Sequence, residues 1–257
     1  MLSDSHCHFD FTVFNDDRES LWRQCKQHGI TQLLMPGIHE QQWHRVAQIS
    51  DQLDGLYFSV GLHPWWLDKQ TKHSKSVLDR LAQYLEHPRC VGIGECGLDA
   101  LKSPPLTQQI HALRQQLEVA CDTQQPVILH CVKAHNELLQ LLNIFPNIQG
   151  VIHGFSGSTE LAQTYWSKGL CMGIGGTITY ERAQKTIRAI QSLPDDALLL
   201  ETDAPDMPLA GKQGQRNSPL ALLTIVKTLA ELRGQSTDEL TQATAKNFAR
   251  VFTRTTL

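Results

Sequence analysis

Residues 126–144 read Pro-Val-Ile-Leu-His-Cys-Val-Lys-Ala-His-Asn-Glu-Leu-Leu-Gln-Leu-Leu-Asn-Ile. The first part, 126–131, is a short and nearly continuous apolar run, as expected of a strand buried in a parallel sheet. The segment 134–144 that follows has the apolar spacing of an amphipathic helix. His130 stands where the strand ends. This stretch therefore predicts a strand–helix unit with an ionisable side chain at the carboxyl end of its strand.

The same alternation extends over the chain of 257 residues. Strands are expected at 2–7, 32–36, 56–61, 90–95, 126–131, 150–153, 169–174 and 197–202. Helices are expected at about 17–28, 39–53, 74–86, 105–123, 134–144, 158–168, 181–192 and 219–233. Ser158 and Gly29 are suited to a helix start and a helix end, and a capped final helix is expected after Ser236-Thr237-Asp238-Glu239.

Eight strand–helix units in this length indicate an α/β fold, a closed (β/α)8 TIM-type barrel, more readily than an open doubly wound sheet. The open sheet would usually bring a glycine-rich phosphate loop after the first strand, and this chain has none there. No composition shift or linker marks a boundary. We therefore expect one domain over residues 1–257, with an extra C-terminal helix.

Composition and charge limit the classes of protein to which the chain can belong. Hydrophobic residues make up 41% of the chain, but no apolar run approaches a membrane span and no export signal opens the sequence. Its 7 cysteines are scattered and odd in number, which suits reduced thiols in the cytoplasm. A net charge of −3 argues against a broadly basic nucleic-acid-binding surface, although a bound metal could still hold a substrate phosphate.

Ionisable side chains follow the apolar strands, and active sites of barrels lie at the carboxyl ends of their strands. In the extended segment His6-Cys7-His8, the two imidazoles point the same way. Burying such groups without a cation would carry a large desolvation cost, so the pattern favours a metal site over a structural polar cluster. The candidate ligands are His6, His8, Glu95, His130, His153 and Asp203.

Six ligands exceed the three that an open catalytic zinc takes from a protein. A carboxylate shared by two ions about 3.5–4 Å apart would account for the surplus, and Glu95 is suited to that bridge. With neutral imidazoles such a centre carries a charge of about +2 and attracts anions. It would lower the pKa of a bound water and stabilise charge on the reacting oxygens. Hydrolysis of a phosphoester is the natural interpretation.

An ordered set of motifs also carries a family resemblance. The set comprises Asp-Ser-His-Cys-His-Phe-Asp at 4–10, Gly-Leu-His-Pro at 61–64, Gly-Glu-Cys-Gly-Leu-Asp at 94–99, Gly-Phe-Ser-Gly at 154–157, Gly-Gly-Thr-Ile-Thr-Tyr at 175–180, Glu-Thr-Asp-Ala-Pro at 201–205 and Asn-Phe-Ala-Arg-Val-Phe at 247–252. The chain resembles the TatD family of metal-dependent deoxyribonucleases, within the amidohydrolase-like barrels, and its YjjV branch above all.

The resemblance implies roles for the six ligands. It puts His6 and His8 on a first metal, His130 and His153 on a second, and Glu95 between the two. Asp203 would bind the first metal and orient or deprotonate the attacking water. Asp203 and Glu95 are therefore the catalytic candidates.

Substrate contacts are less defined. His63, before a proline on the rim, is a candidate for contacting a phosphate, with a plain turn residue as the alternative. Ser156 is a candidate for the pocket lining. Lys133 stands close to the position where relatives often carry an arginine, and could supply the missing charge. Arg216 lies in the polar loop 211–217, where a phosphate contact and a solvated loop are both open.

The adjacent Trp65 and Trp66 could stack on a nucleobase, but packing under a rim loop is the favoured interpretation.

The sequence therefore favours a divalent-metal-dependent hydrolase, a deoxyribonuclease that cleaves phosphodiester bonds at single-stranded or exposed ends. Its cofactors would be two ions of Zn, Mg, Mn or Co. The alternative is a small-molecule amidohydrolase or lactonase on the same barrel, although such sites often bridge their metals with a carboxylated lysine. A non-catalytic binding protein fits the full ligand set poorly. We expect DNA or another phosphoester as the partner, no membrane association, and a monomer or weak oligomer.

Overall fold

The computed structural model describes residues 1–67, 75–253 and 255. Its strands form one parallel sheet in which each pairs with the next along the chain, with Ile128 opposite Val151 as an example of the register. The strands are β1 (Leu2–Asp4), β2 (Ile30–Gly37), β3 (Leu56–Val60), β4 (Cys90–Asp99), β5 (Val127–Val132), β6 (Gly150–Ile152), β7 (Leu170–Ile174) and β8 (Leu198–Leu200).

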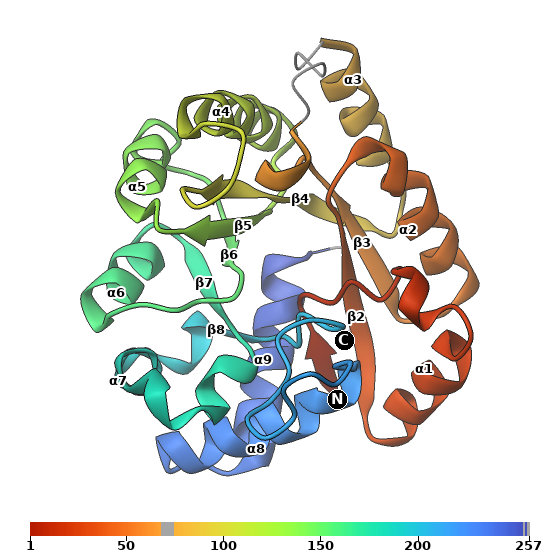
Figure 1. Ribbon diagram of the computed structural model, residues 1–257, viewed down its shortest axis with the longest axis vertical. Helices are drawn as coiled ribbons and strands as arrows, with labels where there is room; N and C mark the ends of the chain where they lie inside the picture. The colour runs from red at the N-terminus through yellow and green to blue at the C-terminus, as the bar shows by residue number, and fades with distance from the viewer. Residues whose placement is uncertain (68–74, 254, 256–257) are drawn as a thin grey trace.

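Helices α1–α8 lie in a ring around these strands, as Figure 1 shows. The helices are α1 (Arg18–Gln27), α2 (Glu40–Gln52), α3 (Lys75–Tyr84), α4 (Leu106–Thr123), α5 (His135–Ile144), α6 (Thr159–Ser167), α7 (Gln184–Ser192), α8 (Leu222–Arg233) and α9 (Thr237–Val251). Among the described residues, none of these helices is long and apolar enough to cross a membrane, and no disulfide joins any two of the cysteines.

The sheet curls until β8 lies beside β1. The backbone N–H of Ser5 donates to the carbonyl of Leu200 at 2.8 Å. The carboxylate of Asp4 accepts from the backbone N–H of Thr202 at 3.0 Å and from its hydroxyl at 2.6 Å. Burial raises the pKa of Asp4 to about 8, although these hydrogen bonds oppose the shift. The expected (β/α)8 barrel is confirmed, and a polar seam joins its first and last strands.

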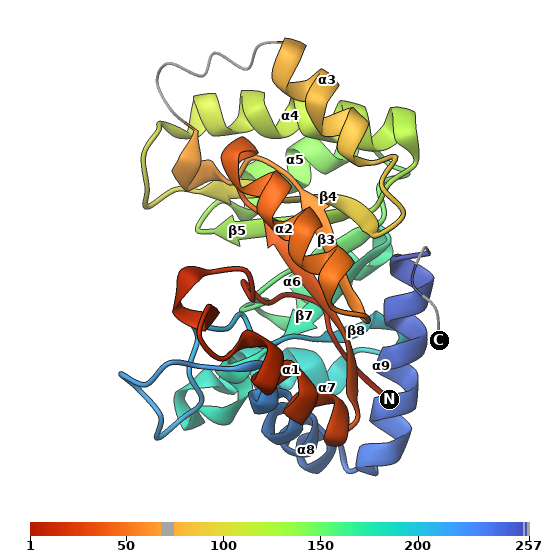
Figure 2. The same ribbon diagram turned by 90° about the vertical axis from the view of Figure 1, so that its right-hand side faces the viewer.

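Two apolar clusters stabilise the barrel. The larger lies between the strands and the surrounding helices. The smaller fills the barrel interior and is built from Leu34, Tyr57, Val91, Ile128, Val151, Cys171 and Leu199, one from each of β2–β8, together with Phe248, Val251 and Phe252 near the end of the chain. Figure 2 shows α9 across the side from which the strands start. The final helix thus closes the amino end of the barrel and leaves the carboxyl end for the site.

The start of α9 is the capped one that the sequence predicts. The Ser236 hydroxyl accepts from the backbone N–H of Glu239, and the Glu239 carboxylate accepts from the backbone N–H of Ser236. Ser158 caps α6 through the backbone N–H of Leu161. Gly29 follows α1 with a φ of 80°, a left-handed conformation that glycine adopts without a steric penalty. These three predictions are confirmed.

Among the strands, the boundaries of β1 and β4 differ most from those expected. The expected strand 2–7 ends its regular pairing at Asp4, because the next N–H groups alternate between neighbours: that of Ser5 donates to Leu200 and that of Cys7 to Leu34. The chain stays extended there, so Cys7 packs into the outer cluster while the flanking histidines face inward. The expected strand 90–95 continues as β4 to Asp99. The expected helix 74–86 begins at a residue outside the described ranges.

Truncating the apolar face of α9 should destabilise the protein strongly. Phe248 is fully buried in the inner cluster, and Phe248→Ala would leave a cavity that the barrel walls cannot fill. We expect a loss of about 3–5 kcal/mol in the free energy of unfolding, measured by urea denaturation. Lys246→Ala, on the exposed face of the same helix, should stay within about 0.5 kcal/mol of the wild type. Equal stabilities of the two variants would contradict this role of α9.

Candidate metal centre

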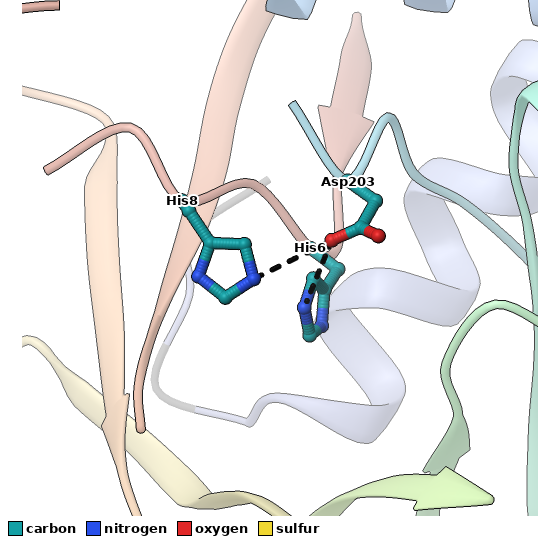
Figure 3. A group of neighbouring side chains, drawn as sticks. All are labelled: His6, His8 and Asp203. Atoms are coloured by element: carbon teal, nitrogen blue, oxygen red, sulfur yellow. Dashed lines mark ion pairs between the residues drawn. The ribbon is translucent and has the colours of Figure 1, made fainter. Parts of the chain in front are cut away.

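Two histidines approach one oxygen of Glu95, and an aspartate approaches the same two histidines. The segment after β1 carries His6 and His8, whose Nε2 atoms lie 3.3 and 3.7 Å from Glu95 Oε2. Asp203, three residues beyond β8, places Oδ1 3.5 Å from Nε2 of His6 and 3.4 Å from Nε2 of His8. Figure 3 shows the two imidazoles and this carboxylate pointing at one another. The barrel seam brings these residues together from opposite ends of the chain.

Three further histidines face the other oxygen of Glu95. Nδ1 of His130, at the end of β5, lies 3.0 Å from Glu95 Oε1. Nε2 of His153, just after β6, lies 3.3 Å from the same oxygen, as does Nε2 of His63, after β3. Glu95 itself is almost completely buried. Its two carboxylate oxygens therefore face two adjoining groups of candidate ligands, which meet where the rings of His6 and His153 stack with centroids 3.7 Å apart.

The donor set fits divalent cations. Neither ring nitrogen of His6, nor Nδ1 of His8, has a hydrogen-bond partner among the described residues, although all three atoms are buried. Such orphaned nitrogens carry a desolvation cost that a ligated ion would remove. Three groups have ligand atoms within 4.8 Å of one another: His6, His8 and Asp203; His6, Glu95 and His153; and His63, Glu95 and His130. Imidazole and carboxylate donors suit zinc, manganese or cobalt.

Electrostatics keep both carboxylates ionised. Burial would raise the pKa of Glu95, but the surrounding imidazoles, His63 and His153 foremost, hold it well below its usual range. Burial likewise opposes the ionisation of Asp203, yet His153 and a hydrogen bond from His8 lower its pKa. Conversely, Glu95 and its acidic neighbours raise the pKa of His153 well above its usual value against the effect of burial. The centre thus offers two ionised carboxylates as donors for a cation.

Carboxylates also lie behind two of the rings. Glu201 Oε1 lies 3.4 Å from Nδ1 of His153 and accepts the backbone N–H of Gly154 at 2.6 Å. Asp99 Oδ2 lies 3.8 Å from Nε2 of His130 and accepts Nε1–H of Trp65 at 2.7 Å. Neither of these two ring nitrogens has a hydrogen-bond partner among the described residues. The two carboxylates are therefore neighbours of the His130 and His153 rings without a direct hydrogen bond to either.

His63 differs from the other histidines of the centre. Its Nδ1 accepts the backbone N–H of Trp65 at 3.2 Å. In the neutral ring this leaves the proton on Nε2, so the nitrogen that faces Glu95 is a donor rather than a lone pair. His63 is therefore suited to donating a hydrogen bond to Glu95 or to a substrate oxygen, as the sequence predicts. Its short distances to Glu95 and His130 also place it in one of the groups of possible ligands.

A cavity of about 170 Å³ opens above the centre. One wall carries the polar side chains of His8, Asp203 and Asp206. The lining also includes the apolar side chains of Phe11, Ile38, Trp65 and Trp66, and the Phe11 ring stacks on that of His8 with centroids 4.7 Å apart. The cavity therefore offers both polar and flat apolar surface to a ligand.

The other predicted substrate contacts lie outside this cavity. Ser156 lines a neighbouring cavity of about 500 Å³ with Thr177 and Met207. Lys133 is exposed at the end of β5 and is not among the described residues that line the metal cavity. The guanidinium of Arg216 donates to Asp17 at 3.0 Å and to the carbonyl of Val13 at 2.7 Å, so it ties the loop after β8 to the start of α1.

The packing interpretation of the paired tryptophans is wrong. Trp65 and Trp66 are 51% and 53% exposed, because a 3₁₀ turn at Pro64–Trp66 holds them on the rim. Lys102, in the loop after β4, places its ammonium 5.0 Å from the centroid of the Trp65 ring. The sequence analysis did not single out this lysine. The only signal for it was its place three residues after Asp99.

A parallel barrel with histidines and carboxylates gathered at the carboxyl ends of its strands defines the class of metal-dependent hydrolases built on amidohydrolase-like barrels. Within this class, the chain belongs to the TatD-related DNase family, whose model matches residues 3–253.

Relatives and a solved structure agree with that membership. The chain is 41% identical over 254 residues to the uncharacterized metal-dependent hydrolase YjjV of Escherichia coli (strain K12), covering 97% of this chain and 96% of that protein. It is 35% identical over 252 residues to the 3′-5′ ssDNA/RNA exonuclease TatD of Erwinia billingiae, covering 94% and 95%. The crystal structure of E. coli YjjV superposes with a TM-score of 0.91 at 40% identity over 98% of both chains. The chain is a metal-dependent hydrolase.

Proposed function

We propose that this hydrolase cleaves phosphodiester bonds at single-stranded or exposed ends of nucleic acid, DNA above all, with two divalent ions in its centre. The observation that carries the proposal is the position of Glu95, whose two carboxylate oxygens face two different groups of candidate ligands. The exonuclease activity named for the Erwinia relative supports nucleic acid as the substrate.

The residues divide between two ion positions. His6, His8 and Asp203 would hold the first ion with Glu95 Oε2, and His130 and His153 would hold the second with Glu95 Oε1. Ions bound there would neutralise the phosphoryl oxygens and lower the pKa of the attacking water.

Asp203 is the proposed proton acceptor. Because neighbouring imidazoles lower its pKa, its carboxylate is ionised at neutral pH and can accept a hydrogen bond from the attacking water. As the water oxygen forms its bond to phosphorus, the bond from phosphorus to the leaving sugar oxygen breaks and the water's proton passes to Asp203. The leaving oxygen takes up a proton from solvent and departs as a hydroxyl group. His63 would donate from Nε2 to a phosphoryl oxygen, which fixes the phosphate over Glu95.

The size and charge of the site favour strand ends. Pockets that enclose drug-sized ligands measure roughly 300–1,000 Å³, so a cavity of about 170 Å³ has room for a single terminal unit. With a net charge of −3 the chain has no excess of cations for a long duplex. Lys133 and Lys102 remain proposed contacts for phosphates further along the strand.

A panel of substrates tests the proposal. Protein reconstituted separately with Zn, Mn, Mg or Co is incubated with end-labelled single-stranded DNA, single-stranded RNA, blunt duplex DNA, and a set of lactones and amides. We expect metal-dependent shortening of the single strands, slower attack on the duplex, and loss of activity after chelation. Efficient hydrolysis of a lactone or an amide, with no phosphodiesterase activity in the presence of any of the four metals, would contradict the proposal and identify the protein as a small-molecule hydrolase.

A further inference from the structure

Among the described residues, burial in the apolar core does not account for the position of the exposed pair Trp65 and Trp66. Large aromatic side chains gain free energy on burial, and this chain buries Trp22 and Trp43 almost completely. Trp65 and Trp66 instead present half of their surface, next to each other, in the wall of the metal cavity. Contiguous exposed apolar surface beside a polar site is a mark of ligand binding.

Trp65 is held in a defined orientation. Its Nε1 donates to Asp99 Oδ2 at 2.7 Å. Its ring stands nearly perpendicular to those of His63 and His130, with centroids 5.1 and 6.0 Å away, and the Lys102 ammonium lies over it. An aromatic ring fixed in this way loses little conformational entropy when a ligand stacks on it.

A single layer of side chains separates the Trp65 ring from the carboxylate of Glu95. His63 and His130, which contact the Trp65 ring, both approach Glu95 Oε1. In a nucleotide the base is likewise separated from its phosphate by one sugar. A nucleotide whose phosphate lies beside Glu95 can therefore bring its flat base against the tryptophan rings.

From this geometry we propose that Trp65 and Trp66 form a nucleobase subsite, which stacks on the unpaired base next to the scissile phosphate. The inference rests on the proposed nuclease function and names what that function recognises: an unpaired, terminal nucleotide of any sequence. Stacking tolerates every base because each has a π-face, and a base within a duplex is already stacked on its neighbours. The preference for single strands would then come from the tryptophans on the rim rather than from the metal ions.

The test compares oligonucleotides that differ in one base. Wild type, Trp65→Ala and Trp66→Ala are assayed on single strands that carry either a normal nucleotide or an abasic tetrahydrofuran nucleotide at one end, with the 3′ and 5′ ends modified in separate substrates. We expect the wild type to lose about 5- to 150-fold in kcat/KM when the base at the attacked end is missing, the range that stacking of one base contributes. The alanine variants should cleave both strands with nearly equal kcat/KM.

Two control variants separate stacking from damage to the centre. Trp65→Phe keeps the ring without the hydrogen bond to Asp99 and should keep most of the dependence on the base. Ile144→Ala removes an apolar side chain that is 55% exposed at the end of α5, away from the cavity, and should match the wild type. The metal content of every variant is measured, because a loss of ions would also lower kcat/KM.

A binding measurement gives a readout that does not depend on turnover. Adenosine 5′-monophosphate should quench the tryptophan fluorescence of the metal-loaded protein and bind about 5- to 150-fold more tightly than ribose 5-phosphate. This difference in affinity between the two ligands should disappear in the double variant that combines Trp65→Ala and Trp66→Ala. Equal cleavage of normal and abasic strands by the wild type, or a base dependence that survives in both alanine variants, would overturn the subsite and leave the nuclease function standing. Failure of the wild type to cleave any strand would overturn both.

Discussion

Asp203→Asn should lower kcat by at least about 100-fold, the lower end of what a general base contributes, while the barrel remains folded. The amide keeps the shape of the side chain and can still approach His6 and His8, but it cannot accept the proton of the attacking water. Asp203 also has a φ of 52°, a backbone conformation that is uncommon outside glycine and concentrates at functional sites. The measurements are kcat on single-stranded DNA, metal content and the circular dichroism spectrum.

Asp122→Asn makes the same chemical change on the exposed surface of α4 and should leave kcat unaltered. Turnover by Asp203→Asn within a few fold of the wild type, at normal metal content, would remove Asp203 from the mechanism.

Glu95→Gln should have the second large effect, because the two oxygens of this carboxylate approach both groups of candidate ligands. We expect the fully loaded wild type to hold two ions within about 4 Å of each other. The variant, which lacks the shared negative charge, should hold one ion or none. Its kcat should fall by more than about 100-fold, the upper end of the cost of changing a group outside the ligand set.

Elemental analysis of the purified, metal-saturated proteins gives the stoichiometry, and a metal-loaded crystal structure gives the separation of the ions. Glu118→Gln is the matched control, since this carboxylate lies on the surface of α4. A wild-type protein that saturates at one ion would contradict the bridging role of Glu95, as would a Glu95→Gln variant that retains two.

Local pattern was enough to predict the barrel and to single out side chains that the fold brings together at its carboxyl end. The strand that carries His130, β5, begins as a continuous apolar run because both of its faces are buried, one in each cluster. Alternation along an extended chain also predicted that Cys7 would point away from His6 and His8. Each of these inferences uses only neighbours in sequence, whose relative directions the backbone geometry fixes.

Contacts set by an irregular turn or by the tertiary fold could not be predicted in this way. The hydrogen bond from the Trp65 backbone to His63 defines which ring nitrogen faces Glu95, and it depends on the 3₁₀ turn of the rim. Arg216 was a candidate for substrate binding because its loop is polar. It instead pairs with Asp17, 199 residues away along the chain. Nothing in the local sequence of either segment reports such a pairing.

The seam between β1 and β8 imposes an order of assembly on the protein. During synthesis His6 and His8 leave the ribosome early, whereas Asp203 and Thr202, which lies 198 residues after Asp4, follow only when most of the chain has been made. A nascent polypeptide therefore carries an incomplete set of donors until its last strand can dock. We expect metal loading, and any capacity to cut nucleic acid, to be confined to completed chains, so that translation fragments ending before β8 are inert.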